Sequence, residues 1–569
     1  LMRGLPAVAA TVKPFVTGYQ SNVMANLTVE SNAVVRILSG MQRLWHTGAS
    51  WDDGRVLNPA VLRANMRHVA EVTRRRTRAE GARAFVQDRQ HQSYAILAGL
   101  GPYSAAYKRI ALAVTGITQA PATTPATTIS DTLPADAPAG SALGAGSPAS
   151  PLGDVVTLVN TVRGPFASGN PSKAAYRYPR PWRMTAESRV VPTGAVDAYG
   201  YPVYRSDVVV EPTLLRQRGL DPADDGGFPS GHTNAFHLAA LAYAYAIPER
   251  FQELVTAAFD LSDTRIVSGM HSPVDVIGGR IMATALAAAT LNDPAHASLK
   301  AAARRQAQTT LLPYAASTAP DAYRDRRANR RLVEAKLTYG LPRNRASTPM
   351  TVPAGAEVLL ETRLPYLTAA ARREVLRTTA VEAGHVLLDG PEHWGRLDLF
   401  AAADGFGAFD RDVTVTMDAS AGGFSAADTW RNDITGRGAL TKAGPGTLTL
   451  TGANTYRGGT TVTAGTLTAA SANALGSGDV VVTGGTLRAT SPLRIRGDYR
   501  QRGGTLAGTL HVEGRADLGG TLDVSAHPRG WKLSARKVTG RFARIVAPKG
   551  YRAEASYTRT TVTVHLRRA

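Results

Sequence analysis

The chain has 569 residues, of which 44% are hydrophobic, enough to bury sizeable cores in several domains. It contains no cysteine, so disulfides, thiolate metal sites and cysteine nucleophiles are excluded. Lysine and arginine outnumber aspartate and glutamate by 65 to 44, and this net charge of +21 indicates either anionic partners or well-solvated helix faces. No basic stretch alternates with aromatic residues, so we expect no nucleic-acid partner.

Helical spacing dominates the first part of the chain, beginning with apolar residues spaced for helices from about 18 to 118. Residues 119–153 are instead rich in Ala, Pro, Thr and Gly with few large side chains, which predicts a low-complexity linker or surface excursion. A helical pattern then resumes. Two prolines predict that the stretch Lys173–Pro181 is a loop, because each restricts the residue before it to extended geometry.

Four later helices are predicted by apolar spacing, at 231–247, 248–261, 273–291 and about 367–380. Ser272, Pro273 and Asp275 have the residue types and spacing of a helix start, with a capping carboxylate three residues after the cap. The apolar stretches all fall short of the ~18 uninterrupted residues that cross a bilayer, so we expect no membrane span.

From about Asp412 the hydrophobic period changes to two. A Gly-Thr-Leu triplet recurs at intervals of 19, 20, 19 and 16 residues, starting at Gly446, Gly465, Gly485, Gly504 and Gly520. Short strands between glycine-rich turns at such a period indicate a β-solenoid. The sequence therefore predicts a multidomain protein: a mainly α-helical bundle over 1–411, followed by a parallel β-helix-like solenoid over 412–569.

Two histidines stand among small polar residues in the helical part. His232 follows Pro-Ser-Gly at a predicted helix start, where open backbone N–H groups attract anions. His271 precedes Asp275 by four residues, and a carboxylate so placed can hold one imidazole nitrogen and make the other a better nucleophile. Each pattern alone also fits a plain helix start, and Asp275 fits both roles.

Three sequence blocks occur in order: Lys173-x6-Arg180-Pro181, Pro229-Ser230-Gly231-His232 and Thr264-Arg265-x5-His271-x3-Asp275. Together they resemble the signature of the type 2 phosphatidic acid phosphatase superfamily, whose soluble members include class A-type acid phosphatases and vanadium-dependent haloperoxidases. One departure is visible, because Thr264 stands where the family has serine. Threonine keeps the hydroxyl, so we expect a small effect.

The resemblance implies roles for the matched positions. His271 would attack phosphorus and form a phosphohistidine, Asp275 would orient it, and His232 would protonate the leaving alcohol and then activate water. The groups that would bind the phosphoryl oxygens are Lys173, Arg180, Ser230, Gly231 and Arg265. Fixed cations meet the charge of the phosphoryl oxygens, so we expect neither a metal nor a cofactor. The acidic pair at 224–225 is interpreted as part of a turn rather than a metal site.

The expected function is that of a secreted, metal-independent phosphatase that hydrolyses monoesters of phosphorylated small molecules. The alternative within the superfamily is a haloperoxidase that holds vanadate with the same residues. An alternative of another class is a surface-binding solenoid protein whose helical domain is catalytically idle.

The repeat region also carries a resemblance. Residues 444–467 resemble the autotransporter-associated strand repeat of secreted bacterial passenger domains. This implies an extracellular or cell-surface location, with the periplasm as a second option. It also implies contact with a cell surface or matrix through the solenoid.

Overall fold

The computed structural model describes residues 12–315 and 318–569. The chain forms two compact units, one made of Leu1–Leu359 and Val381–Phe400 and the other of Leu360–Ala380 and Ala401–Ala569. The first unit is mainly helical and the second is mainly a parallel β-solenoid, which confirms the predicted fold class.

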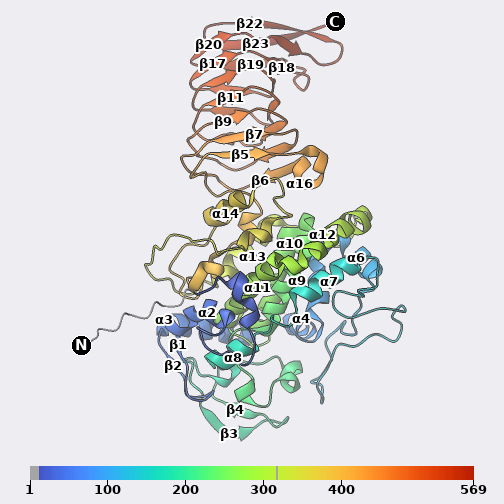
Figure 1. Ribbon diagram of the computed structural model, residues 1–569, viewed down its shortest axis with the longest axis vertical. Helices are drawn as coiled ribbons and strands as arrows, with labels where there is room; N and C mark the ends of the chain where they lie inside the picture. The colour runs from blue at the N-terminus through green and yellow to red at the C-terminus, as the bar shows by residue number, and fades with distance from the viewer. Residues whose placement is uncertain (1–11, 316–317) are drawn as a thin grey trace, which may run out of the picture. The chain divides into compact units, whose positions relative to one another are not determined.

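Three helices that pack against one another form the centre of the first unit: α9 (Gly231–Ala246), α10 (Phe251–Val267) and α11 (Pro273–Asn292) (Figure 1). Around them lie α3 (Pro59–Arg75), α4 (Arg78–Arg89), α7 (Gly153–Val162), α8 (Asn170–Tyr176), α12 (Ala297–Gln306) and α13 (Arg326–Thr338). Helix α11 is buried from Pro273 to Leu291. Among the described residues it is the one helix long and apolar enough to cross a membrane, and a buried core helix passes the same test.

Two glycines of α11 allow the loop before α9 to come very close. A Cβ at Gly278 would lie 2.4 Å from the ring of Phe228, and one at Gly279 would lie 2.7 Å from the carbonyl oxygen of Ser230. Backbone contact at this distance is open only to glycine. The close approach brings the first turn of α9 beside the first turns of α11.

Two local predictions are corrected by the structure. Helix α10 does not end at 261 but continues to Val267, and its additional turn is buried, with Thr264, Arg265 and Ile266 packed inside the unit. Lys173 lies in the last turn of α8 rather than in a loop. The prolines act only downstream of Arg177, whose left-handed backbone (φ 48°) ends the helix.

The low-complexity stretch 119–152 is described without any helix or strand. Polar contacts hold part of it to the rest of the unit. Asp131 accepts hydrogen bonds from the backbone of His91 and Gly116, and Gln217 accepts one from the backbone of Ile129.

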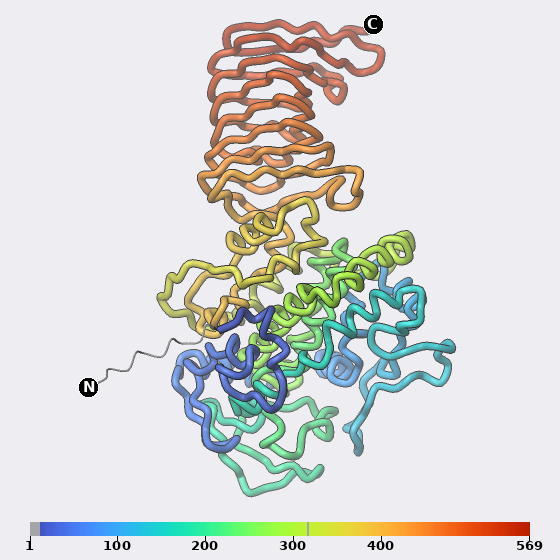
Figure 2. Tube along the Cα trace, viewed as in Figure 1, coloured from blue at the N-terminus to red at the C-terminus, as the bar shows by residue number. Residues whose placement is uncertain are grey.

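The solenoid of the second unit consists of two parallel seven-stranded sheets and a third sheet. The first sheet has the order β21-β18-β15-β12-β10-β8-β6, with strands Arg544–Val546, Thr521–Asp523, Thr505–Ala507, Thr486–Ala489, Thr466–Ala469, Thr447–Leu450 and Ala427–Trp430. The second has the order β20-β17-β14-β11-β9-β7-β5, with strands Lys537–Gly540, Arg515–Leu518, Tyr499–Gln501, Val480–Val482, Thr460–Val462, Leu440–Ala443 and Val413–Thr416. The trace winds through successive coils that supply one strand to each sheet (Figure 2).

The Gly-Thr-Leu triplets stack on one another in this solenoid. Thr447, Thr466, Thr486, Thr505 and Thr521 are direct partners along the first sheet, and the leucine after each is fully buried. From the second triplet on, the glycine has a positive φ of 58° to 66°, a conformation that L side chains rarely adopt. The repeat therefore arises because each coil needs one tight turn, one paired residue and one core residue.

The third sheet has the order β13-β16-β19-β23-β22 and includes a terminal antiparallel hairpin. Its strands are Leu493–Ile495, Leu510–Val512, Trp531–Ser534, Thr561–Arg568 and Tyr551–Tyr557. The second unit also contains α14 (Ala369–Thr378), which matches the helix predicted near 367–380.

Candidate active site

His271 lies buried just before α11, held between a carboxylate and a guanidinium. Its Nδ1 lies 3.2 Å from Oδ2 of Asp275, and its Nε2 lies 3.0 Å from Nη1 of Arg180. Arginine can only donate, so Nε2 accepts and the proton of the neutral ring lies on Nδ1, donated to Asp275. The same Asp275 oxygen accepts the Ser272 backbone N–H at 2.9 Å, so the capping carboxylate also orients the histidine.

Arg180 is held by a second carboxylate. Its Nε lies 2.9 Å from Oδ1 of Asp225, and the other oxygen of Asp225 lies 3.1 Å from Nη2 of the buried Arg183. Arg183 also donates to the carbonyl of Gly219 and lies over the ring of Trp182. Asp225, which the sequence predicted only as part of a turn, thus positions the guanidinium that contacts His271.

Arg265 and His232 meet at the end of α4. The guanidinium of Arg265, on the last turn of α10, forms a buried ion pair with Asp88, which also pairs with Arg89. His232 Nε2 lies 2.8 Å from the carbonyl oxygen of Asp88. A carbonyl only accepts, so Nε2 carries the proton and Nδ1 keeps a free lone pair. Asp88 therefore fixes both Arg265 and the orientation of His232.

The start of α9 supplies the remaining groups. Ser230 caps the helix, and its hydroxyl accepts the backbone N–H of Thr233, while its own N–H donates to the carbonyl of Asp275. Gly231 opens the first turn, and Nζ of Lys173 lies 3.8 Å from where a Cβ at Gly231 would stand. A helix N-terminus beside an ammonium group favours an anion.

Thr264 does not contribute its hydroxyl to this group. It is buried on α10 and donates to the carbonyl of Leu261 at 2.5 Å. A serine at this position could make the same bond, so the exchange of serine for threonine leaves the polar contacts unchanged.

Burial and the cations shift the pKa values of these groups strongly. Burial, aided by Arg180, lowers the pKa of Lys173 to about 7, and burial with Arg265 lowers that of His232 to about 3. The pKa of His271 lies well below 6.5, because burial and the cations around it, Arg180 first, disfavour the imidazolium. Burial also raises the pKa of Asp275 to about 7. The site as described therefore favours neutral imidazoles.

The structure brings all eight predicted site residues into one cluster, although their roles stay predictions. Sequence reasoning missed Asp88 and placed Asp225 in a turn without a partner. Asp88 lies 177 positions from Arg265 and belongs to no matched block, so no local pattern pointed to it. Asp225 could have been found from its charge, since it stands close before the block that carries His232.

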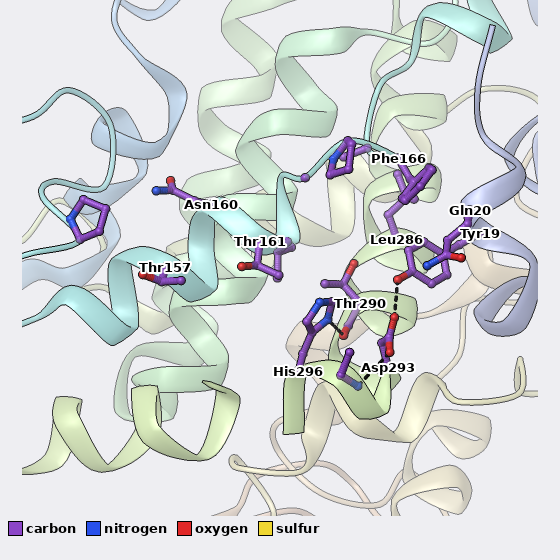
Figure 3. Close-up of a pocket in the computed structure, with 16 residues that line it drawn as sticks. Tyr19, Gln20, Thr157, Asn160, Thr161, Phe166, Leu286, Thr290, Asp293 and His296 are labelled. Atoms are coloured by element: carbon purple, nitrogen blue, oxygen red, sulfur yellow. Dashed lines mark hydrogen bonds between the residues drawn. The ribbon is translucent and has the colours of Figure 1, made fainter. Parts of the chain in front are cut away.

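A sizeable hollow in the described part of the first unit lies away from this cluster. It has a volume of about 600 Å³ and is lined by α7, the end of α11 and residues near Tyr19 (Figure 3). Figure 3 shows Tyr19 joined to Asp293, at 2.7 Å, with Thr161 and Asn160 on α7. None of the eight predicted site residues lines it, because His271 precedes the first turn of α11 and Thr290 stands in its last.

Comparison with known families places the cluster in context. Residues 154–297 match the model described as the PAP2 superfamily, and they contain all three sequence blocks. The first unit therefore contains a phosphatase-like domain of the PAP2 superfamily. Residues 440–469 match the passenger-associated-transport-repeat family, so the solenoid carries an autotransporter-type repeat.

Curated relatives are similar to separate parts of the chain. A non-specific acid phosphatase of Salmonella typhi is 43% identical over 56 residues, covering 10% of this chain and 22% of that protein. An extracellular serine protease of Serratia marcescens is 32% identical over 152 residues, covering 21% of this chain and 14% of that protein. The autotransporter lipoprotein NalP of Neisseria meningitidis serogroup B is 35% identical over 134 residues, with 22% and 12% covered. The chain thus spans less than a quarter of the length of these relatives.

Proposed function

We propose that this protein is a secreted phosphatase that hydrolyses phosphate monoesters of small molecules through a phosphohistidine on His271. One observation carries the proposal: Nε2 of His271 faces a cluster of cations with unused donors. Nε of Arg265 is buried without a hydrogen-bond partner, and no partner is described for Nζ of Lys173. Donors of this kind match the equatorial oxygens of a phosphoryl group.

In the first step, Nε2 of His271 attacks phosphorus and the bond from phosphorus to the ester oxygen breaks. The proton on Nδ1 stays directed at Asp275, which stabilises the positive charge that develops on the ring. The leaving oxygen takes a proton from His232. A bound phosphoryl dianion would raise the pKa of His232 from its low value, so that Nδ1 of His232 carries a proton when the ester is bound.

In the second step, water attacks the phosphohistidine and gives its proton to Nδ1 of His232. The bond between phosphorus and Nε2 breaks, inorganic phosphate leaves, and His271 returns to the neutral form. Throughout, Arg180, Arg265 and Lys173 oppose the charge on the oxygens. Fixed cations of this kind stand where other enzymes place a metal ion, so we propose that no metal or cofactor takes part.

A location outside the cytoplasm belongs to the proposal. The solenoid repeat belongs to a family associated with passenger transport. Two relatives, matched over 152 and 134 residues, are named an extracellular serine protease and an autotransporter lipoprotein. Exposure of the chain to externally added protease on intact cells tests this location. Protection in intact cells and cleavage only after lysis would place the protein inside.

The decisive experiment measures release of p-nitrophenol from p-nitrophenyl phosphate by the full chain, with and without a chelator. We expect turnover that the chelator leaves unchanged, and a loss of roughly 10³-fold or more in kcat for His271→Ala. The matched control is His237→Gln on α9, a buried histidine outside the cluster, which should keep its activity.

A phosphorylated intermediate provides an independent readout. Rapid quenching with a labelled monoester should trap label that is stable to base and labile to acid in the wild type but not in His271→Ala. Oxidation of bromide in the presence of vanadate and peroxide, without phosphate release, would instead assign the haloperoxidase reaction. If His271→Ala were as active as the wild type, the His271 cluster would not be the source of the hydrolysis. The helical unit would then be idle, and the solenoid would be the functional part.

A further inference from the structure

The end of the solenoid carries a concentrated positive charge. Residues 529–569 contain eleven lysines and arginines and a single acidic residue, Glu554, whereas residues 401–528 contain eleven charges of each sign. The first stretch therefore has a net charge of +10 and the second has none. All eleven cations are exposed. They lie on the last coil and on the β22–β23 hairpin, gathered at one end of the stack (Figure 1).

Little of this charge is neutralised within the chain. Arg567 pairs with Glu554 at 3.2 Å, and Arg541 lies over the ring of Tyr557. The described structure of residues 529–569 contains no other ion pair. Arg552 and Arg567 are direct partners across β22 and β23, and both are exposed. Like charges directly opposite one another destabilise a sheet, so an anion bound between them would stabilise it.

One face of the third sheet carries the cations in register. Lys532 of β19 stands opposite Thr563 of β23, which stands opposite Ser556 of β22. Arg567 and Arg552 follow four residues along the same strands and so share this face, roughly 13 Å away. We call this face, defined by Lys532, Arg552 and Arg567, the terminal basic face. It interleaves cations with hydroxyl groups, and it also holds Glu554, the ion-pair partner of Arg567, between Arg552 and Ser556.

Protection of sheet edges explains only part of the charge. Strands β20 and β21 end their sheets, and charged side chains such as Lys537 and Arg544 on such edges oppose association with other strands. The terminal basic face is different, because Lys532 and Arg567 stand on the inner strands β19 and β23 and only Arg552 stands on the edge strand β22.

The side chains around the face restrict the kind of partner. None of the exposed large apolar residues described for this chain lies within 529–569, so the face has no anchor for a bilayer interior. Trp531 and Phe542 are buried against each other, and Tyr551 and Tyr557 are half-buried on the side of β22 opposite to Arg552, so the face presents no platform for stacking of unpaired bases. The face can therefore recognise a partner only through the positive charge of its cations and through hydrogen bonds from its hydroxyl groups.

We propose that the terminal basic face binds a linear acidic polysaccharide, whose carboxylate or sulfate groups contact the arginines while its sugar hydroxyls contact Thr563 and Ser556. This binding would occur whether or not the helical unit is a phosphatase. It assigns the solenoid a ligand class in addition to a place in secretion.

The test uses the full chain and three immobilised probes: heparin and polygalacturonate as acidic polysaccharides, and a mixed-sequence duplex DNA. Vesicles with and without anionic phospholipid form a fourth arm. The variant Lys532→Ala/Arg552→Ala/Arg567→Ala should lose roughly tenfold or more in affinity for both polysaccharides at moderate salt. The matched control Arg63→Ala/Arg67→Ala/Arg75→Ala removes the same charge from the exposed face of α3 and should bind as the wild type does.

A second variant guards against loss of structure. Lys532→Arg/Arg552→Lys/Arg567→Lys keeps the charge and should keep binding, and all variants should retain the wild-type melting temperature and ester hydrolysis. Tighter binding to duplex DNA or to anionic vesicles than to either polysaccharide would overturn the assignment of the partner. If the alanine variant still binds polysaccharide and differs from the wild type only in associating with itself, the face serves to prevent aggregation and the proposal is wrong.

Discussion

Asp225 and His271 are linked through a single guanidinium, since Arg180 lies 2.9 Å from the carboxylate by Nε and 3.0 Å from the imidazole by Nη1. Replacement Asp225→Asn removes the charge that holds Arg180 while keeping the size of the side chain. A misplacement of about 1 Å in such a group costs roughly 10²-fold, and we expect a loss of this order in kcat/KM.

The neighbouring substitution Asp224→Asn provides the control for Asp225. Asp224 is exposed on a short turn, Pro222–Asp224, and should leave kcat/KM within about twofold of wild type. Hydrolysis of p-nitrophenyl phosphate and inhibition by inorganic phosphate measure both variants. Equal effects of the two substitutions would mean that Asp225 matters only for local structure.

The charge on Lys173 predicts an alkaline limb in the pH profile. Burial and Arg180 lower the pKa of Lys173 to about 7, so its ammonium group is present below pH 7 and lost above it. In the wild type, kcat/KM should fall up to tenfold per pH unit above about pH 7, as a binding cation disappears. Lys173→Arg keeps the charge and should remove this limb. If kcat/KM instead rises as the pH passes through 7, ionisation of Asp275 rather than loss of the Lys173 charge controls the profile.

Acid should destabilise the helical unit through its buried histidines. Burial, with Arg280, lowers the pKa of His237 to about 3, so the folded state keeps this ring neutral while the unfolded chain binds a proton below about pH 6.5. The stability is therefore full above pH 6.5 and falls as the pH drops towards 3. His237→Leu should gain about 2 kcal/mol over wild type on going from pH 8 to pH 5. Denaturation curves at both pH values measure this gain, and an identical difference at the two would contradict it.

The stacked leucines of the solenoid should each contribute strongly to its stability. Leu487 is fully buried between Leu467 and Leu506, whereas the next residue, Arg488, is exposed. Leu487→Ala should lower the free energy of unfolding of the second unit by about 3 kcal/mol, through lost burial and the cavity left behind. Arg488→Ala, with a change within about 0.5 kcal/mol, is the matched control in a calorimetric scan.

Local sequence predicted the parts of the site that local geometry controls. Pro273 and Asp275 fit a helix start whatever the rest of the chain does, and the structure has that start. The solenoid could be predicted equally well, because each Gly-Thr-Leu triplet supplies the turn, the paired residue and the core residue of its own coil. The loop expected at Lys173 was partly wrong, since Pro171 favours a helix start there and outweighs the prolines further on.

Long-range contacts were beyond the reach of the sequence. The partner of Arg265 is Asp88 on a helix far earlier in the chain, and only packing of α4 against α10 brings them together. The hydroxyl of Thr264 was expected to be interchangeable with that of serine, and the structure adds the reason, namely a bond within its own helix. Such partners depend on the fold as a whole rather than on spacing.

The like-with-like register of the coils has a consequence for how this chain can change in evolution. Thr466 pairs with Thr447 on one side and with Thr486 on the other, and the leucines that follow match in the same way. Removal or duplication of one complete coil would bring identical residue types back into contact, so the remaining coils would keep the same pairing and the same buried leucines. A gene encoding this chain can therefore lengthen or shorten its solenoid by recombination between repeats without inventing a new core.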